Sequence, residues 1–196
     1  ITWINAREYQ GNMKELNNLQ GIIKPGGFGN NGIENMISMI KDIRKMNIPV
    51  FGICLGMQLM IIEYLRGEFF KKATSEEFDM EGTNVITKLI TKGDLGGSMR
   101  LGLKEIILCP NSNVKKIYGK EHIVERHRHR YAMNGLYKKY LIIDWNVSTS
   151  VDNITEVVEF KNHPWYIGTQ YHPEYNSTPF NPHPLFLSFI KHCITI

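Results

Sequence analysis

The amino-acid sequence predicts an α/β domain: an open, twisted, mostly parallel sheet flanked by helices and extended by additional β-hairpins. Two short apolar segments, 21–24 and 50–53, are each followed by glycine residues and then by a segment of helical periodicity. This alternation is typical of βαβ units and a parallel sheet. The second half of the chain instead contains a series of apolar segments of strand type, and these predict the hairpins.

Each element follows from a local signal. The first stretch predicts a strand and a polar connection, and the glycine-rich residues 25–29 predict a turn. Helices are predicted where apolar residues recur at three- and four-residue spacing, over 33–44, 55 to about 66, and 184 to about 193. Strands are predicted at the short apolar segments 21–24, 50–53, 85–90, 99–108, 122–133, 141–147, 156–160 and 165–171.

Length and composition indicate one globular domain over residues 1–196. The chain is 42% hydrophobic and 21% charged, which excludes disorder, and no run of about 18 apolar residues predicts a membrane span. Three cysteines, Cys54, Cys109 and Cys193, are too few for a disulfide framework and suit a reducing, cytoplasmic location. The net charge of +4 does not indicate a polyanionic partner. The chain begins without Met or a signal peptide, so we expect a piece of a longer protein.

The most specific motif is Gly52-Ile53-Cys54-Leu55-Gly56, which joins a predicted buried strand to a helix. A nucleophile between two glycines at such a turn is the pattern of a nucleophile elbow. The helix N-terminus favours the thiolate, and the Leu55 N–H would point at a developing oxyanion. The alternative is a buried cysteine that acts as a small hydrophobic residue. The flanking glycines favour Cys54 as the nucleophile.

A thiolate nucleophile usually needs a base, and the best candidate is His172. It follows the apolar segment 165–171 and precedes Glu174 by two residues, with Pro173 between them. Glu174 could hold the imidazole in the correct tautomer, which is the third role of a catalytic triad. The alternative is a strand-end histidine beside a surface glutamate. Together with the elbow, the pattern predicts a triad of Cys54, His172 and Glu174.

The glycine-rich turn at 25–29 offers backbone N–H groups between a strand and a helix, so it could supply a second oxyanion donor. A phosphate-binding loop is the rival interpretation, but the chain has no GxxxxGK[ST] motif. A purely structural turn is also open.

The segment ERHRHRY is strongly basic. As a strand it would place Arg126, Arg128 and Arg130 on one face and His127 and His129 on the other. Nucleic-acid binding is one interpretation, although the patch is short. Zinc binding by the histidines lacks a suitably spaced Cys or carboxylate, so no metal is expected. Two interpretations remain. One guanidinium could recognise an anionic group of a substrate, or the segment could be a strand whose charged side chains are solvated.

In order along the chain, PGGFG, FGICLGMQ, LGGSMRLG, ERHRHRY, QYHPE, STP and HPLF resemble the class I (triad) glutamine amidotransferases, and among them the glutaminase domain of the CTP synthase family. The resemblance covers the chain from about Gly21 to its end. ERHRHRY and GGSMRLG separate this family from other amidotransferases. They disfavour another hydrolase on the same elbow, such as a γ-glutamyl hydrolase or peptidase. The intact triad disfavours a non-catalytic regulatory or binding module.

The resemblance implies that Cys54 attacks the side-chain amide of L-glutamine and forms a γ-glutamyl thioester. His172 would protonate the leaving ammonia and then act as base for water, with Glu174 orienting it. The N–H groups of Gly27 and Leu55 would form the oxyanion hole. The residues implied to bind glutamine are Gly27, Phe28, Leu55, Gly56, Met57, Gln58, Glu77 and Arg130. Glu77 is chosen over Glu76 because Phe78 follows it.

The resemblance also implies that ammonia passes to a synthetase domain of the same parent chain. There ATP and Mg²⁺ would activate UTP for amination to CTP, a step of pyrimidine biosynthesis. No cofactor is expected in this domain, which has no P-loop. The parent is expected to be a homotetramer with no nucleic-acid or membrane partner, and GTP is its expected allosteric activator.

Three departures from the family pattern bear on these expectations. The family often has Arg-Gly-x-Glu after GGFG, in a lid linked to GTP activation. Here Asn31 replaces the arginine, and a neutral amide cannot reproduce a bidentate guanidinium contact. The connection after Thr91 is shorter than in the family, and the family's initial strand and helix lie before the start of this chain.

Overall fold

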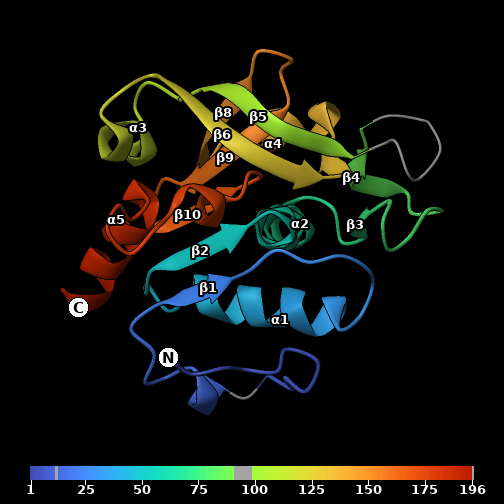
Figure 1. The fold of residues 1–196 in the computed structure, drawn as a ribbon. Helices are drawn as coiled ribbons and strands as arrows, with labels where there is room; N and C mark the ends of the chain where they lie inside the picture. The colour runs from blue at the N-terminus through green and yellow to red at the C-terminus, as the bar shows by residue number, and fades with distance from the viewer. Residues whose placement is uncertain (12, 91–98, 196) are drawn as a thin grey trace.

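The computed structural model describes residues 1–11, 13–90 and 99–195 (Figure 1). The strands are β1 (Ile22–Lys24), β2 (Val50–Ile53), β3 (Ala73–Ser75), β4 (Asn84–Leu89), β5 (Arg100–Ile107), β6 (His122–His129), β7 (Tyr131–Met133), β8 (Trp145–Ser150), β9 (Thr155–Phe160) and β10 (Tyr166–Thr169). The α-helices are α1 (Ile33–Arg44), α2 (Leu55–Glu68), α3 (Asn113–Tyr118), α4 (Lys138–Leu141) and α5 (Pro184–Ile194). The 3₁₀ helices are η1 (Met13–Glu15), η2 (Gly135–Tyr137) and η3 (Pro173–Asn176).

The described strands form a seven-stranded sheet in the order β1-β2-β10-β9-β8-β5-β6 and a three-stranded sheet in the order β3-β4-β7. In the larger sheet β2 pairs in parallel with both β1 and β10, and the remaining pairings are antiparallel. The predicted α/β class is therefore confirmed. The sheet is mixed and not mostly parallel as predicted, because only the three strands that carry the candidate site, β1, β2 and β10, pair in parallel in it.

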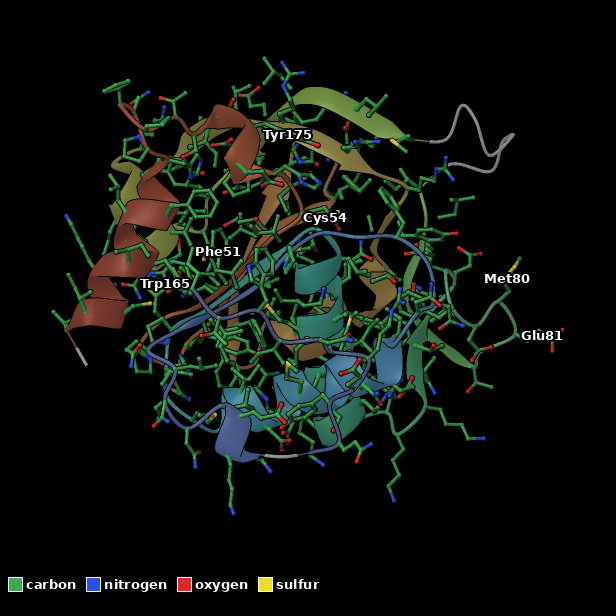
Figure 2. All side chains as sticks on the ribbon, turned by 60° about the horizontal axis from the view of Figure 1, so that its bottom comes forward. Phe51, Cys54, Met80, Glu81, Trp165 and Tyr175 are labelled. Atoms are coloured by element: carbon green, nitrogen blue, oxygen red, sulfur yellow. The ribbon has the colours of Figure 1, made fainter. Side chains whose placement is uncertain are left out.

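Helices cover both faces of this sheet (Figure 1). Side chains of β2 alternate between two apolar clusters, because successive residues of a strand point to opposite faces. Val50 packs on the side of α1 and α2, whereas Phe51 and Ile53 pack on the side of α5. Phe51 and Trp165 meet edge to face beside α5, with ring centroids 5.4 Å apart (Figure 2). α2 is buried between the sheet and its neighbours, which places its N-terminus in the molecular interior.

Most predicted elements are present, but three predictions are wrong. Residues 1–11 contain no strand, because this polar stretch folds into turns and leaves Trp3 90% exposed. The predicted strand 141–147 begins only at Trp145, since Leu141 ends the short helix α4 and is buried there. The predicted strand 122–133 bends at Arg130, because β6 pairs with β5 whereas β7 pairs with β4 of the other sheet.

The short elements β3, α3 and α4 and the 3₁₀ helices were not anticipated. The sequence contained a signal for α3, because Ser112 is a favourable N-cap and its hydroxyl accepts the N–H of Lys115.

Residues 91–98, which hold the short connection and the first part of LGGSMRLG, lie outside the described residues. Every helix among the described residues is too short or too polar to cross a lipid bilayer.

Candidate active site

Cys54 lies at the sharp turn from β2 into α2, as the elbow motif predicts. Its backbone is strained, with φ 55° and ψ −106°. A Cβ at Gly52 would overlap the Met60 sulfur and nearby backbone, and a Cβ at Gly56 would overlap the carbonyl oxygen of Lys24. Glycine is therefore required on both sides of the cysteine, and the nucleophile-elbow geometry is confirmed at the level of backbone and packing.

His172 and Glu174 lie at the carboxyl end of β10, next to the elbow. The Nδ1–H of His172 donates to Glu174 Oε1 over 2.6 Å, which assigns the tautomer because a carboxylate only accepts. Pro173 starts η3 between them, and the Tyr175 ring stacks on the imidazole with centroids 5.0 Å apart. Figure 2 labels Tyr175 in this segment and Cys54 at the start of α2. The geometry expected for an oriented base is present.

The second ring nitrogen of His172, Nε2, is buried and makes no hydrogen bond with any described residue. Burial lowers the pKa of His172, but interaction with the Cys54 sulfur and the Glu174 carboxylate outweighs burial and raises the pKa to about 10. The imidazole therefore holds its proton at neutral pH when it faces a thiolate. This arrangement suits an ion pair of thiolate and imidazolium.

The glycine-rich turn 25–29 lies directly against the elbow. A Cβ built on Gly26 would lie 3.1 Å from His172 Cε1 and 3.4 Å from Cys54 Cβ, so Gly26 packs between the two side chains. A Cβ on Gly27 would lie 3.4 Å from Leu55 Cδ2. The two backbone segments expected to form an oxyanion hole are therefore neighbours in the structure.

Glu77 contacts the same turn from another element, and the charge of Arg130 acts on Glu77. Glu77 Oε1 accepts the N–H of Gly29 over 2.8 Å, whereas Glu76 accepts the N–H of Leu89. Burial raises the pKa of Glu77, and the Gly29 N–H and the Arg130 charge oppose this rise. Arg130 Nε is buried without a hydrogen-bond partner among the described residues. Of the two adjacent glutamates, Glu77 is the one that faces the turn.

Gln58 is 3% exposed, one helical turn after Cys54. Its Nε2 donates to the carbonyl oxygen of Tyr131 over 2.9 Å and to Gln170 Oε1 over 3.1 Å. Met57 points into the core, where its side chain packs on Gly168, so any substrate contact there belongs to its backbone. Sequence reasoning gave Gln170 no role, although a glutamine at the end of an apolar segment, two residues before the predicted base, was a signal.

Phe28, in the glycine-rich turn, is 54% exposed, and Gly56 is buried in the elbow. The predicted site residues thus lie on the elbow, on the turn 25–29, on the segment after β10, and at Glu77, which contacts the turn. Arg130 is linked to them through its charge interaction with Glu77.

The strand β6 shows the predicted alternation, except that Arg130 lies beyond the end of the strand and is half-buried. Arg126 and Arg128 are exposed, and Glu125, His127 and His129 are buried. Glu156 of β9, which sequence spacing could not reveal, brings a carboxylate to the two histidines, so that the ligand atoms lie within 4.8 Å of one another.

The guanidinium of Arg100 lies among these possible metal ligands. Its Nη1 lies 2.7 Å from Glu156 Oε1 and 3.3 Å from His129 Nε2, and His127 Nε2 lies 2.7 Å from Glu156 Oε2. A guanidinium at this position repels a metal cation and neutralises the carboxylate. The group is therefore a buried ion-pair network.

Comparison with known proteins agrees with this geometry. Residues 1–192 match the model of the family "Glutamine amidotransferase class-I". The chain is 42% identical to a CTP synthase from Hydrogenobaculum sp. over 97% of this chain and 37% of the relative. It is 46% identical to a CTP synthase from Pelagibacter ubique over 91% of this chain and 36% of the relative. The chain thus spans little more than a third of these curated relatives.

Among solved structures, the chain resembles the glutaminase domain of Trypanosoma brucei CTPS, which was solved with bound acivicin. The TM-score is 0.93 at 32% identity, and the match covers 100% of this chain and 80% of that one.

Proposed function

Because the chain belongs to the class I glutamine amidotransferase family, we propose that it hydrolyses L-glutamine and serves as the glutaminase domain of a CTP synthase. The ammonia would feed ATP-dependent amination of UTP in a synthetase domain of the parent chain. The observation that carries the proposal is the strained Cys54 beside the hydrogen-bonded pair of His172 and Glu174.

In the proposed reaction, the Cys54 thiolate attacks the side-chain carbonyl carbon of glutamine and forms an S–C bond. The carbonyl electrons move to the oxygen, which the N–H groups of Gly27 and Leu55 stabilise. The C–N bond then breaks, and His172 gives its Nε2 proton to the leaving ammonia. Glu174 holds the ring in place through Nδ1. The product is a γ-glutamyl thioester.

Water then attacks the thioester, with the neutral His172 as general base, and glutamate leaves as the thiolate returns. Glu77 and Arg130 would bind the ammonium and the carboxylate of the substrate, because their charges are complementary to those groups. Backbone and side-chain groups from Phe28 and from Leu55 to Gln58 would enclose the remainder of the glutamine.

The test uses 6-diazo-5-oxo-L-norleucine, a reactive glutamine analogue, followed by intact-mass measurement and peptide mapping. We expect one adduct on Cys54 that excess glutamine prevents, and none on Cys54→Ala. Labelling of Cys109 or Cys193 instead would overturn the triad. In the full-length parent, Cys54→Ala should abolish glutamine-dependent CTP synthesis and preserve ammonia-dependent synthesis, and loss of both would contradict the proposed division of labour.

A further inference from the structure

Gln170 is a buried polar side chain at the candidate site. It directly follows β10 and has 0% exposure. Its backbone N–H donates to the Glu156 carbonyl over 2.8 Å, which anchors the residue to β9. Its side-chain Nε2 lies 3.8 Å from the sulfur of Cys54. Burial of an amide is costly unless its polar atoms are used, so both ends of this side chain need a partner.

The hydrogen-bond network assigns the orientation of the Gln170 amide. The Tyr131 carbonyl oxygen only accepts, so Gln58 must present its NH₂ group there. The same NH₂ group reaches Gln170, which must therefore present its oxygen to Gln58. The NH₂ group of Gln170 is then left on the side of Cys54. A flipped amide would place an acceptor against the sulfur and a donor against Gln58.

The other described groups near the Cys54 sulfur are not neutral side-chain donors. The Arg128 carbonyl oxygen lies 3.9 Å away and can accept from a thiol, but it gives nothing to a thiolate. Among the described residues, His172 at the start of η3 and Lys24 of β1 are titratable groups that interact with the sulfur. Among the described side chains that contact the sulfur, Gln170 provides a neutral donor whose protonation does not change with pH.

We propose that Gln170 is a further catalytic residue, whose side-chain N–H donates to the Cys54 thiolate and holds the sulfur in place for attack. A hydrogen bond to a charged acceptor is stronger than one to a neutral acceptor, so the contact favours the thiolate over the thiol. The bond weakens as the sulfur becomes a neutral thioester and forms again when the thiolate is released. The role in glutamine hydrolysis rests on the proposed function, whereas the contact with the sulfur does not.

The test compares wild type with Gln170→Met, which keeps the size of the side chain and removes the donor. The rate of Cys54 alkylation by iodoacetamide is measured from pH 5 to 10, with peptide mapping to follow this cysteine alone. We expect alkylation at pH 7 to fall about tenfold and its pH midpoint to rise by about one unit, since a tenfold change in equilibrium corresponds to one unit. For glutamine, kcat should fall about tenfold, with KM changed less than about twofold.

Two variants separate this role from a structural one. Gln170→Glu replaces the donor with a carboxylate beside the sulfur, so it should raise the alkylation midpoint at least as far. Ser188→Ala removes a half-buried hydrogen bond, from Trp165 Nε1, at the opposite end of β10, and should leave the midpoint unchanged. An unchanged midpoint in both Gln170 variants would overturn the proposal. Wild type without glutaminase activity would overturn the proposed function, and alkylation would still decide the role of Gln170.

Discussion

The side-chain amide of Asn176 donates a hydrogen bond to Glu125 Oε2 over 2.7 Å, and this contact ties η3 to β6. The other carboxylate oxygen of Glu125 lies 2.9 Å from both His183 Nε2 and the Tyr118 hydroxyl. The tautomer of His183 is set by Leu185, whose N–H donates to Nδ1, so Nε2 carries the proton that Glu125 accepts. One buried carboxylate therefore joins β6, α3, η3 and the start of α5, beside the predicted base.

Glu125→Ala should lower the free energy of unfolding by about 2–4 kcal/mol, because it leaves the buried His183 imidazole, the half-buried Tyr118 hydroxyl and the exposed Asn176 amide without this acceptor. Urea denaturation measures the loss. Glu121→Ala is the control, since Glu121 is exposed and forms an ion pair with Lys115 at the surface. A change of less than about 0.5 kcal/mol in Glu125→Ala would contradict the role of this network.

Asn176→Ala should act mainly on the proposed reaction. It removes the bond between η3 and Glu125, while Glu174 and its bond to His172 remain. We expect kcat for glutamine to fall about tenfold because the orientation of the base loosens, and a misplacement of about 1 Å is costly. Steady-state kinetics measure the effect, and kcat equal to that of wild type would show that η3 is held without this contact.

Gly26→Ala should impair labelling by the glutamine analogue at least about tenfold, since the added methyl group would lie between His172 and Cys54. Gly135→Ala is the matched control, because a Cβ there meets no heavy atom within 4 Å. Both rates come from the time course of adduct formation. Equal rates in the two variants would mean that the sulfur and the imidazole do not need this close approach.

The His172 imidazole should titrate at a pKa of about 10 in wild type, because its interactions with Cys54 and Glu174 outweigh burial. Folding raises the pKa of His172 above its value in the unfolded chain, about 6.5. The protonated ring therefore contributes its full stabilisation of the fold below about pH 6.5, and this stabilisation is lost as pH rises to about 10. In Cys54→Ala the pKa should fall. NMR titration of the ring measures both proteins, and a wild-type midpoint near 6.5 would refute the ion pair.

Arg100→Ala should destabilise the protein by about 3–5 kcal/mol, because it leaves the Glu156 carboxylate buried without its guanidinium partner. The matched control is Arg126→Ala, which removes an exposed arginine from the neighbouring strand β6. Urea denaturation of the two variants provides the comparison. Equal stabilities would indicate that His127 alone compensates Glu156.

Local patterns predicted the segments that carry the candidate chemistry. The alternation of short apolar strands and periodic helices placed β1, β2, α1 and α2 nearly to the residue, because these elements are compact and contiguous. The glycines around Cys54 are required because the sharp turn leaves no room for a side chain on either side of the cysteine. The hydrogen bond between His172 and Glu174 joins residues only two positions apart, so the sequence could predict it. Alternation along β6 likewise separated its arginines from its histidines.

The amino-acid sequence by itself therefore determined the fold class, the strained cysteine and the histidine–glutamate pair, since each depends on residues only a few positions apart. The tertiary structure decided which distant groups meet: Gln170 with Cys54, Asn176 with Glu125, and Arg100 with Glu156. It also decided that most strand pairings are antiparallel and that β6 and β7 separate at Arg130. The physical reason is that strand partners and buried polar contacts are selected by packing of the whole chain, which no local pattern records.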